Sequence, residues 1–233
     1  MANKTASKSK KEVGFLGKTY LLAYNGAQVA GWSYILYLMG QYYTADPKPQ
    51  QSLWEIVRTA LIIFQNAAVL EVFHAIFGLV SSNAMVTLFQ VASRVMVVCG
   101  VLIGVEGASD SQGLHFLLFA WTVTEIIRYS FYAMGILGVS IYPIVWCRYT
   151  FFIALYPIGV TGELLCLWAA SQLVGASKQW TLTFPNSWNA TFNYQYFLVI
   201  VMVLYVPLFP QMYLHMFGQR KKVLGGGAIK KKN

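Results

Sequence analysis

Six long apolar stretches, separated by short polar segments, dominate the sequence. They cover residues 20–40, 53–80, 84–105, 114–137, 140–174 and 192–217. A helix needs about 20 residues to cross the hydrocarbon core of a bilayer. Because backbone polar groups in lipid must be hydrogen-bonded within the chain, such stretches predict helices, and they are too long and continuous for the strands of a membrane barrel. The sequence therefore predicts an all-α integral membrane protein, a bundle of six transmembrane helices.

The composition excludes both a soluble globular protein and a disordered chain. Of the 233 residues, 57% are hydrophobic and 11% are charged, whereas soluble domains average about 25% charged residues. A chain of this length cannot bury so much apolar surface in a single water-soluble core, and disorder requires low hydrophobicity. Cys99, Cys147 and Cys166 all lie in apolar stretches, so no disulfide framework is expected.

The stretch over residues 140–174 is long for one crossing. Two short helices would also account for its length, but no polar segment divides it. We expect one long helix that tilts or extends past the bilayer.

Basic residues are concentrated in the two tails and predict the topology. Five lysines precede the first apolar stretch and six basic residues follow the last one, although the whole chain has only 17 Lys and Arg. Positively charged flanks are typical of the cytosolic side, and six crossings place both termini on one side. We expect cytosolic tails over residues 1–18 and 218–233 and a membrane domain over residues 19–217. The tails favour anionic lipid headgroups over nucleic acid as a partner.

The C-terminus carries a candidate targeting signal. Lys230 and Lys231 stand fourth and third from the end, which is the spacing of a di-lysine signal for retrieval to the endoplasmic reticulum. Such signals are read by receptors and are not anchors. A multi-pass protein of the endoplasmic reticulum membrane is therefore expected.

Charged residues inside the apolar stretches point to function, because charge in hydrocarbon is costly. The ionisable side chains there are Glu55, Arg58, Glu71, His74, Arg94, Glu125, Arg128, Arg148 and Glu163. A subset of them falls in the middle or the cytosolic half of the membrane and could line one polar cavity: Glu71, His74, Arg94, Arg128 and Arg148.

A purely structural interpretation of these charges is also open. Glu55 with Arg58, and Glu125 with Arg128, are spaced three residues apart and can pair on one helical face. His74 can serve as a buried hydrogen-bonding residue. No Cys and His spacing suggests a metal site. The sequence also lacks a C-x5-R phosphatase loop and a glycine-rich phosphate loop.

The stretch over residues 140–174 contains the most informative pair of residues. Tyr156 and Glu163 are seven residues apart, so in a helix they share a face and lie about 10.5 Å apart along the axis. Tyr142 and Tyr149 extend this row, and Pro157 removes one backbone donor. A phenol and a carboxyl group on one face could handle a proton at each end of a two-carbon unit. Tyr is also common in membrane helices as a core or interface residue.

Four segments together resemble the very-long-chain 3-hydroxyacyl-CoA dehydratases, also called protein-tyrosine-phosphatase-like membrane proteins. They are YLLAYNGAQVAGWSYILY (20–37), LEVFHAIFGLVSS (70–82), WTVTEIIRYSFYA (121–133) and RYTFFIALYPIGVTGE (148–163). The resemblance extends over about residues 20–217.

The resemblance implies an enzyme that removes water from (3R)-3-hydroxyacyl-CoA to give trans-2-enoyl-CoA, the third step of the fatty-acid elongation cycle. The family's catalytic Tyr and Glu fall on Tyr156 and Glu163. Other enzymes of the cycle (a condensing enzyme, a ketoacyl reductase and an enoyl reductase) are implied as partners. An acid and a base suffice for this reaction, so neither a cofactor nor a metal is expected.

Roles for the charged residues follow from this chemistry. We expect Glu163 to move the protons and Tyr156 to donate a hydrogen bond to the departing hydroxyl or the thioester oxygen. The roles are reversed if Arg148 stabilises a Tyr156 phenolate. Residues expected to contact the CoA phosphates or to orient the site are Arg148, Arg94, Arg128, Tyr149, Glu71, His74 and Glu125. A lipid transporter and an inactive scaffold of the elongation complex are the alternatives.

Overall fold

The structure, a computed structural model, describes residues 14–185, 187 and 190–225. Within these residues it is helical, with a single β-bridge between Leu182 and Phe192 and no strand. The helices are α1 (Phe15–Thr44), α2 (Leu53–Ala67), α3 (Val69–Ile76), α4 (Ala84–Val95), the π-helix η1 (Met96–Ile103), the 3-10 helix η2 (Ala108–Asp110), α5 (Gly113–Leu137), α6 (Tyr142–Arg148), α7 (Phe152–Ser177) and α8 (Tyr194–Leu224). The predicted all-α class is confirmed.

Four helical segments in the described part of the chain are long and apolar enough to cross a membrane. They are Leu53–Ile76, which joins α2 and α3, Ala84–Ile103, which joins α4 and η1, and the helices α7 and α8. They correspond to four of the six predicted stretches. The other two stretches form α1 and α5, which have spanning length but bury polar side chains such as Asn25 and Glu125. Four of the six predicted stretches thus form helices with the length and apolar composition of membrane spans.

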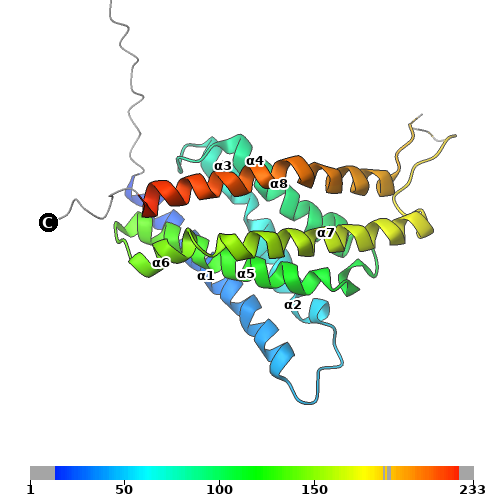
Figure 1. Cartoon of the computed structure of the whole chain (residues 1–233), viewed down its shortest axis with the longest axis horizontal. Coiled ribbons are helices and arrows are strands. Elements are labelled where there is room, and N and C mark those ends of the chain that lie inside the picture. The colour runs from blue at the N-terminus through cyan, green and yellow to red at the C-terminus, as the bar shows by residue number, and fades with distance from the viewer. Residues whose placement is uncertain (1–13, 186, 188–189, 226–233) are drawn as a thin grey trace, which may run out of the picture.

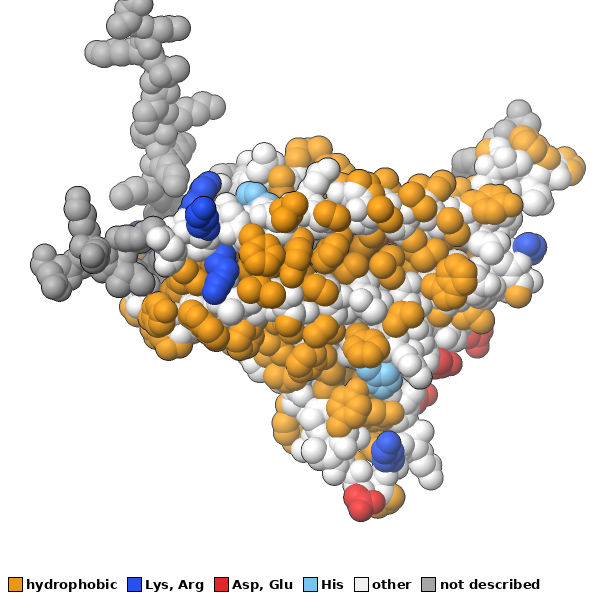
Figure 2. Space-filling model, viewed as in Figure 1, with side chains coloured by type: hydrophobic (Ala, Val, Ile, Leu, Met, Phe, Trp, Pro, Cys, Tyr) orange, Lys and Arg blue, Asp and Glu red, His pale blue; other side chains and the backbone are white. Residues whose placement is uncertain are grey.

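Helix α5 lies at the centre of the bundle. Helices α1 and α7 pack along it, and α8 packs on α7 (Figure 1). The core between these elements is filled by large side chains such as Trp32, Leu61 and Leu117. In contrast, α8 buries only Leu198. Hydrophobic side chains cover the face of the bundle seen in Figure 2, and an apolar surface of this extent is suited to lipid.

The prediction of one helix over residues 140–174 is wrong. The chain forms two helices, α6 and α7, with a turn at residues 149–151 in which Thr150 N–H bonds to the carbonyl three residues back, that of Cys147. Two contacts hold α6 against the end of α5: the Tyr149 ring meets Phe131 edge-on at 6.1 Å, and Arg148 lies 6.0 Å from the Tyr132 ring. A straight helix over the stretch would be about 50 Å long, well beyond the hydrocarbon core. The predicted row of Tyr142, Tyr149 and Tyr156 on one helical face is therefore interrupted at this turn.

Glycines allow α5 and α7 to cross at very short range. A Cβ atom on Gly162 would lie 2.4 Å from the backbone nitrogen of Leu117 and 2.7 Å from the carbonyl oxygen of Gly113. Only glycine fits at such a distance, as at other small-residue crossings in membranes. This crossing places the α5 residues that follow Leu117 directly against the middle of α7.

Pro157 interrupts the hydrogen bonds of α7, and α8 compensates for the loss. Proline has no N–H, so the carbonyl of Ile153, four residues earlier, loses its helical donor. The hydroxyl of Tyr213 in α8 donates a hydrogen bond to this carbonyl at 2.9 Å. A neighbouring side chain thereby satisfies a backbone group that lipid could not, and α8 is fixed against α7.

Replacement Tyr213→Phe should destabilise the protein without disturbing the apolar packing, because only the bond to Ile153 is lost. We expect a loss of about 1 kcal/mol and a Tm in detergent lower by about 2–4 °C. Tyr196→Phe on the same helix is the matched control, since the Tyr196 side chain is exposed. Equal melting temperatures for the two variants would contradict the role given to Tyr213.

Candidate active site

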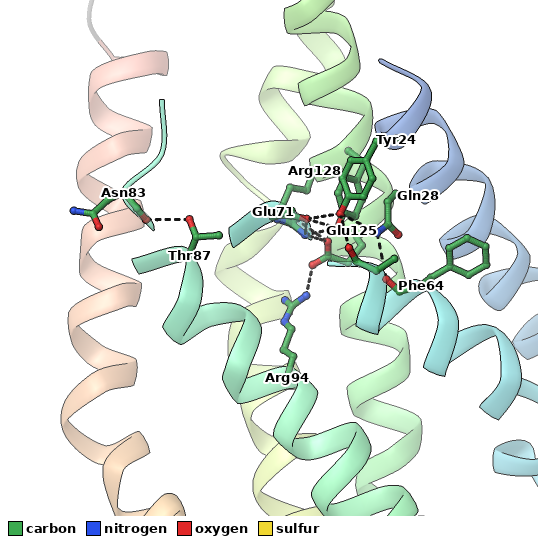
Figure 3. Close-up of polar contacts among 11 residues, drawn as sticks. Tyr24, Gln28, Phe64, Glu71, Asn83, Thr87, Arg94, Glu125 and Arg128 are labelled. Carbon is green, nitrogen blue, oxygen red and sulfur yellow. Dashed lines mark hydrogen bonds and ion pairs between the residues drawn. The ribbon is translucent and has the colours of Figure 1, made fainter. Parts of the chain in front are cut away.

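A largely buried cluster of four charged side chains, with Glu125 at its buried centre, joins three helices of the bundle. Arg128 of α5 contacts both oxygens of Glu71 in α3, at 2.7 and 3.0 Å, and Glu125 at 2.7 Å. Arg94 of α4 pairs with the other oxygen of Glu125 (Figure 3). Two carboxylates thus balance two guanidinium groups, which is what burial of charge requires. The predicted pairing of Glu125 with Arg128 is confirmed.

Two phenol groups complete the hydrogen bonding of the Glu71 carboxylate, and an amide group supports one of them. Tyr129 donates a hydrogen bond to its carboxylate, and Tyr24 donates a longer one of 3.4 Å. Gln28 in turn donates to the hydroxyl of Tyr24 at 3.1 Å (Figure 3). Tyr24 belongs to α1, so this shell ties α1 to the charged cluster.

His74 and Glu55 take structural roles at the ends of their helices. The buried His74 ring shares a 2.9 Å hydrogen bond with Tyr20, in line with the structural interpretation of this residue. Glu55 accepts a hydrogen bond of 2.8 Å from the backbone of Ser52 and closes a capping box at the start of α2. No ion pair joins it to Arg58 in the part of the chain that the structure describes.

Glu163 lies deep between α5, α7 and α8 and is 9% exposed. Trp121 Nε1 donates to Glu163 Oε1 at 2.8 Å, and Tyr205 Oη donates to Oε2 at 2.6 Å. Both donors are neutral. Among the described residues, Glu163 forms no ion pair, unlike Glu71 and Glu125. The Arg94 guanidinium lies 5.1 Å from the centre of the Trp121 ring, so Trp121 connects the charged cluster to Glu163.

Tyr156 lies two turns before Glu163 on α7 and is half-buried. Its ring contacts Phe152 edge-on at 5.8 Å. Tyr156 and Arg148 line one small indentation between α5, α6 and α7, together with Thr124. Within the described residues, no protein group is hydrogen-bonded to the Tyr156 hydroxyl, which leaves this phenol available to a bound molecule.

The structure therefore divides the sequence-predicted residues into groups. Glu71, Arg94, Glu125 and Arg128 bond to one another, with His74 beside their tyrosine shell. Arg148 is apart from these ion pairs and lies near Tyr156, and Tyr149 packs on Phe131. The Tyr132 ring lies within 6.0 Å of Arg148 and 5.8 Å of Arg128. No group of three or more metal-binding side chains is present in the described ranges.

Sequence reasoning missed Trp121 and Tyr205, the two partners of Glu163. A signal for Trp121 exists, because Trp121, Glu125 and Arg128 are spaced i, i+4 and i+7 and share one face of α5. Tyr205 offers none: it stands in an apolar helix without a charged neighbour, and its partner is 42 residues away.

Comparison with known proteins decides the family. The model of the family "Protein tyrosine phosphatase-like protein, PTPLA" matches residues 65–226. The chain belongs to this family. The matched region includes every member of the charged cluster, as well as Tyr156, Glu163 and Tyr205. No solved structure matches the chain.

Relatives in the PTPLA family share most of their length with this chain. A very-long-chain (3R)-3-hydroxyacyl-CoA dehydratase of Caenorhabditis elegans is 48% identical over 92% of this chain and 98% of its own. Dehydratase 2 of Mus musculus is 42% identical, over 93% and 85%. The dehydratase PASTICCINO 2 of Arabidopsis thaliana is 35% identical, over 91% and 96%. The resemblance seen in the sequence is confirmed.

Replacement Glu125→Gln tests the charged cluster. Removal of this carboxylate leaves Arg94 without its counterion and Arg128 with only one, so we expect a loss of about 3–5 kcal/mol of stability. The measurement is the yield of monodisperse protein in detergent and its Tm. Glu106→Gln, at an exposed position, should change neither quantity. A Glu125→Gln variant as stable as the wild type would show that the cluster does not hold the bundle together.

Proposed function

We propose that this chain dehydrates very-long-chain (3R)-3-hydroxyacyl-CoA to trans-2-enoyl-CoA, the third step of fatty-acid elongation. The observation that carries the proposal is the surroundings of Glu163. Among the described residues this buried carboxyl group has no ion-pair partner, and it lies on the same helix as a Tyr156 hydroxyl that no described protein group engages. Relatives that carry this dehydratase name, at 35% to 48% identity, support the reaction and the substrate class.

The chemical step of the reaction needs a base and an acid. A base takes the proton on C2, next to the thioester, and the electrons of that C–H bond form the C2=C3 double bond. The C3–O bond breaks, and the oxygen leaves as water after it receives a proton. Protons and electrons balance, so a positioned acid–base pair completes the cycle.

Glu163 is the residue we assign to the proton transfers. Its two hydrogen-bond donors are neutral, and no cation is paired with it among the described residues. We assign Tyr156 to the hydrogen bond on the departing hydroxyl or the thioester oxygen. The two residues lie about 10.5 Å apart along α7, so the reacting part of the substrate would lie along this helix between them.

The CoA phosphates are assigned to the basic end of the bundle. Arg94 and Arg128 pair with carboxylates, so they are less suited to this task than Arg148, which pairs with none in the described part. The end of α8 lies close to Arg148, because Phe217 contacts Phe152 at 5.1 Å. That end carries three consecutive cations, Arg220, Lys221 and Lys222. Acidic side chains lie away from this end in the view of Figure 2.

The basic end also supports a topology. We propose that α1, α2 with α3, α4 with η1, α5, α7 and α8 each cross the membrane, which gives six crossings. Lys18 at the start of α1 and the lysines at the end of α8 then face the cytosol. Helix α8 continues to Leu224, so the tail expected from residue 218 begins as helix. Lys230 and Lys231, the proposed retrieval signal to the endoplasmic reticulum, lie outside the described residues. A condensing enzyme and two reductases of the cycle are the proposed partners.

Two substitutions test the catalytic assignment. Glu163→Gln and Tyr156→Phe should each lower turnover at least 100-fold while expression and Tm stay close to wild type. The assay follows conversion of 3-hydroxyacyl-CoA to the enoyl product by purified protein, with Tyr142→Phe, an exposed phenol, as the control. Wild-type rates in either variant would refute the assignment. A wild-type chain that forms no product would favour the scaffold or the transporter.

Charge reversal tests the CoA site. The double variant Arg148→Glu, Lys221→Glu should raise KM about 10-fold or more and change kcat little, because the charges act on a part of the substrate that does not react. Lys178→Glu, on the loop after α7, is the matched control. A 3-hydroxyacyl-pantetheine thioester without phosphates should show the same KM with wild type and double variant. An unchanged KM for the CoA thioester would show that the phosphates do not bind at this end of the bundle.

A further inference from the structure

Two helices, α5 and α8, each donate one hydrogen bond to the carboxylate of Glu163. Trp121 of α5 donates to one oxygen and Tyr205 of α8 to the other, at 2.8 and 2.6 Å. A carboxylate has about four acceptor positions, two on each oxygen. The two donors occupy one position on each oxygen, so one position on each remains for a proton that comes from or goes to a substrate.

Each donor is itself fixed by the packing around it. The ring of Trp121 is 2% exposed, and Arg94 lies 5.1 Å from its centre. The close crossing at Gly162 brings α5 against α7 one residue before Glu163. Tyr205 packs against the main hydrophobic core. The direction of both N–H and O–H donors is therefore set before any substrate binds, which is the requirement for preorganised catalysis.

Helix α8 is attached to α7 by two phenols with different partners. Tyr213 bonds to the backbone carbonyl of Ile153, whereas Tyr205 bonds to the side chain of Glu163. The rest of α8 is largely exposed, and Leu198 is its only buried residue. Aromatic contacts of Phe152 with Tyr213 and Phe217 also join the two helices. The Tyr205 hydroxyl differs from that of Tyr213 in that its partner is the side chain to which we assign the proton transfers.

We propose that Tyr205, together with Trp121, is a positioning residue for the reaction. The Tyr205 hydroxyl and the Trp121 indole hold the Glu163 carboxylate in one orientation, with its free acceptor positions toward the reacting carbons. Neither residue needs to touch the substrate. The proposal rests on the proposed function, since it assumes that Glu163 transfers the protons.

The experiment compares Tyr205→Phe with Tyr213→Phe in the purified full chain. Each variant deletes one phenol oxygen on α8 that bonds to α7. Tyr205→Phe should lower kcat about 10- to 100-fold, because a hydrogen bond to a charged group contributes about 1.5–3 kcal/mol, with KM within about 2-fold. Tyr213→Phe should lose a similar amount of thermal stability and keep kcat. Trp121→Phe should resemble Tyr205→Phe in its effect on kcat.

A second background separates positioning from general stability. In Glu163→Asp, the shortened side chain no longer reaches Tyr205, so adding Tyr205→Phe should change its residual kcat less than 2-fold. A purely structural tyrosine would lower kcat by the same factor in both backgrounds, and that result, or a Tyr205→Phe enzyme with wild-type kcat, overturns the inference. If the wild type forms no enoyl-CoA, the proposed function is refuted and this inference falls with it.

Discussion

Arg128 forms ion pairs with both Glu71 and Glu125, and the rest of the bundle depends on this contact. It joins α3 to α5, and Arg94 extends it to α4. Charges of this kind can be buried only when they are neutralised and hydrogen-bonded on all sides. The need to bring all four side chains together therefore constrains how α3, α4 and α5 pack on one another.

The charged cluster also determines the surroundings of Glu163, which is not one of its members. The two carboxylates and two guanidinium groups of the cluster balance one another, and in the described part of the chain the buried carboxyl group of Glu163 is bonded to an indole and a phenol alone. Arg94 forms its ion pair with Glu125, and its guanidinium lies 5.1 Å from the centre of the Trp121 ring. The two donors occupy one acceptor position on each carboxylate oxygen, so a position on each remains open to a substrate.

Sequence reasoning reached the all-helical class, four helices of spanning length, the Glu125–Arg128 pair and the family. These follow from local patterns: apolar length, the i+3 spacing and ordered motifs. It failed at residues 149–151, where α6 turns back to place Arg148 and Tyr149 on the aromatic end of α5. No run of polar residues, glycine or proline marks this turn, whose helix α6 contacts the end of α5. Tyr205 was missed for the same reason.

The sequence by itself determined that this chain is helical, has helices long and apolar enough to cross a membrane, carries most of its positive charge near its ends and belongs to the PTPLA family. Apolar length and charge act locally or through solvent, so they can be assessed along a single chain. Only the tertiary structure decided which charges neutralise one another and that Glu163 keeps none of the cations. The partners in question come from different helices, and the glycine crossing of α5 and α7 and the docking of α8 set the distances between them.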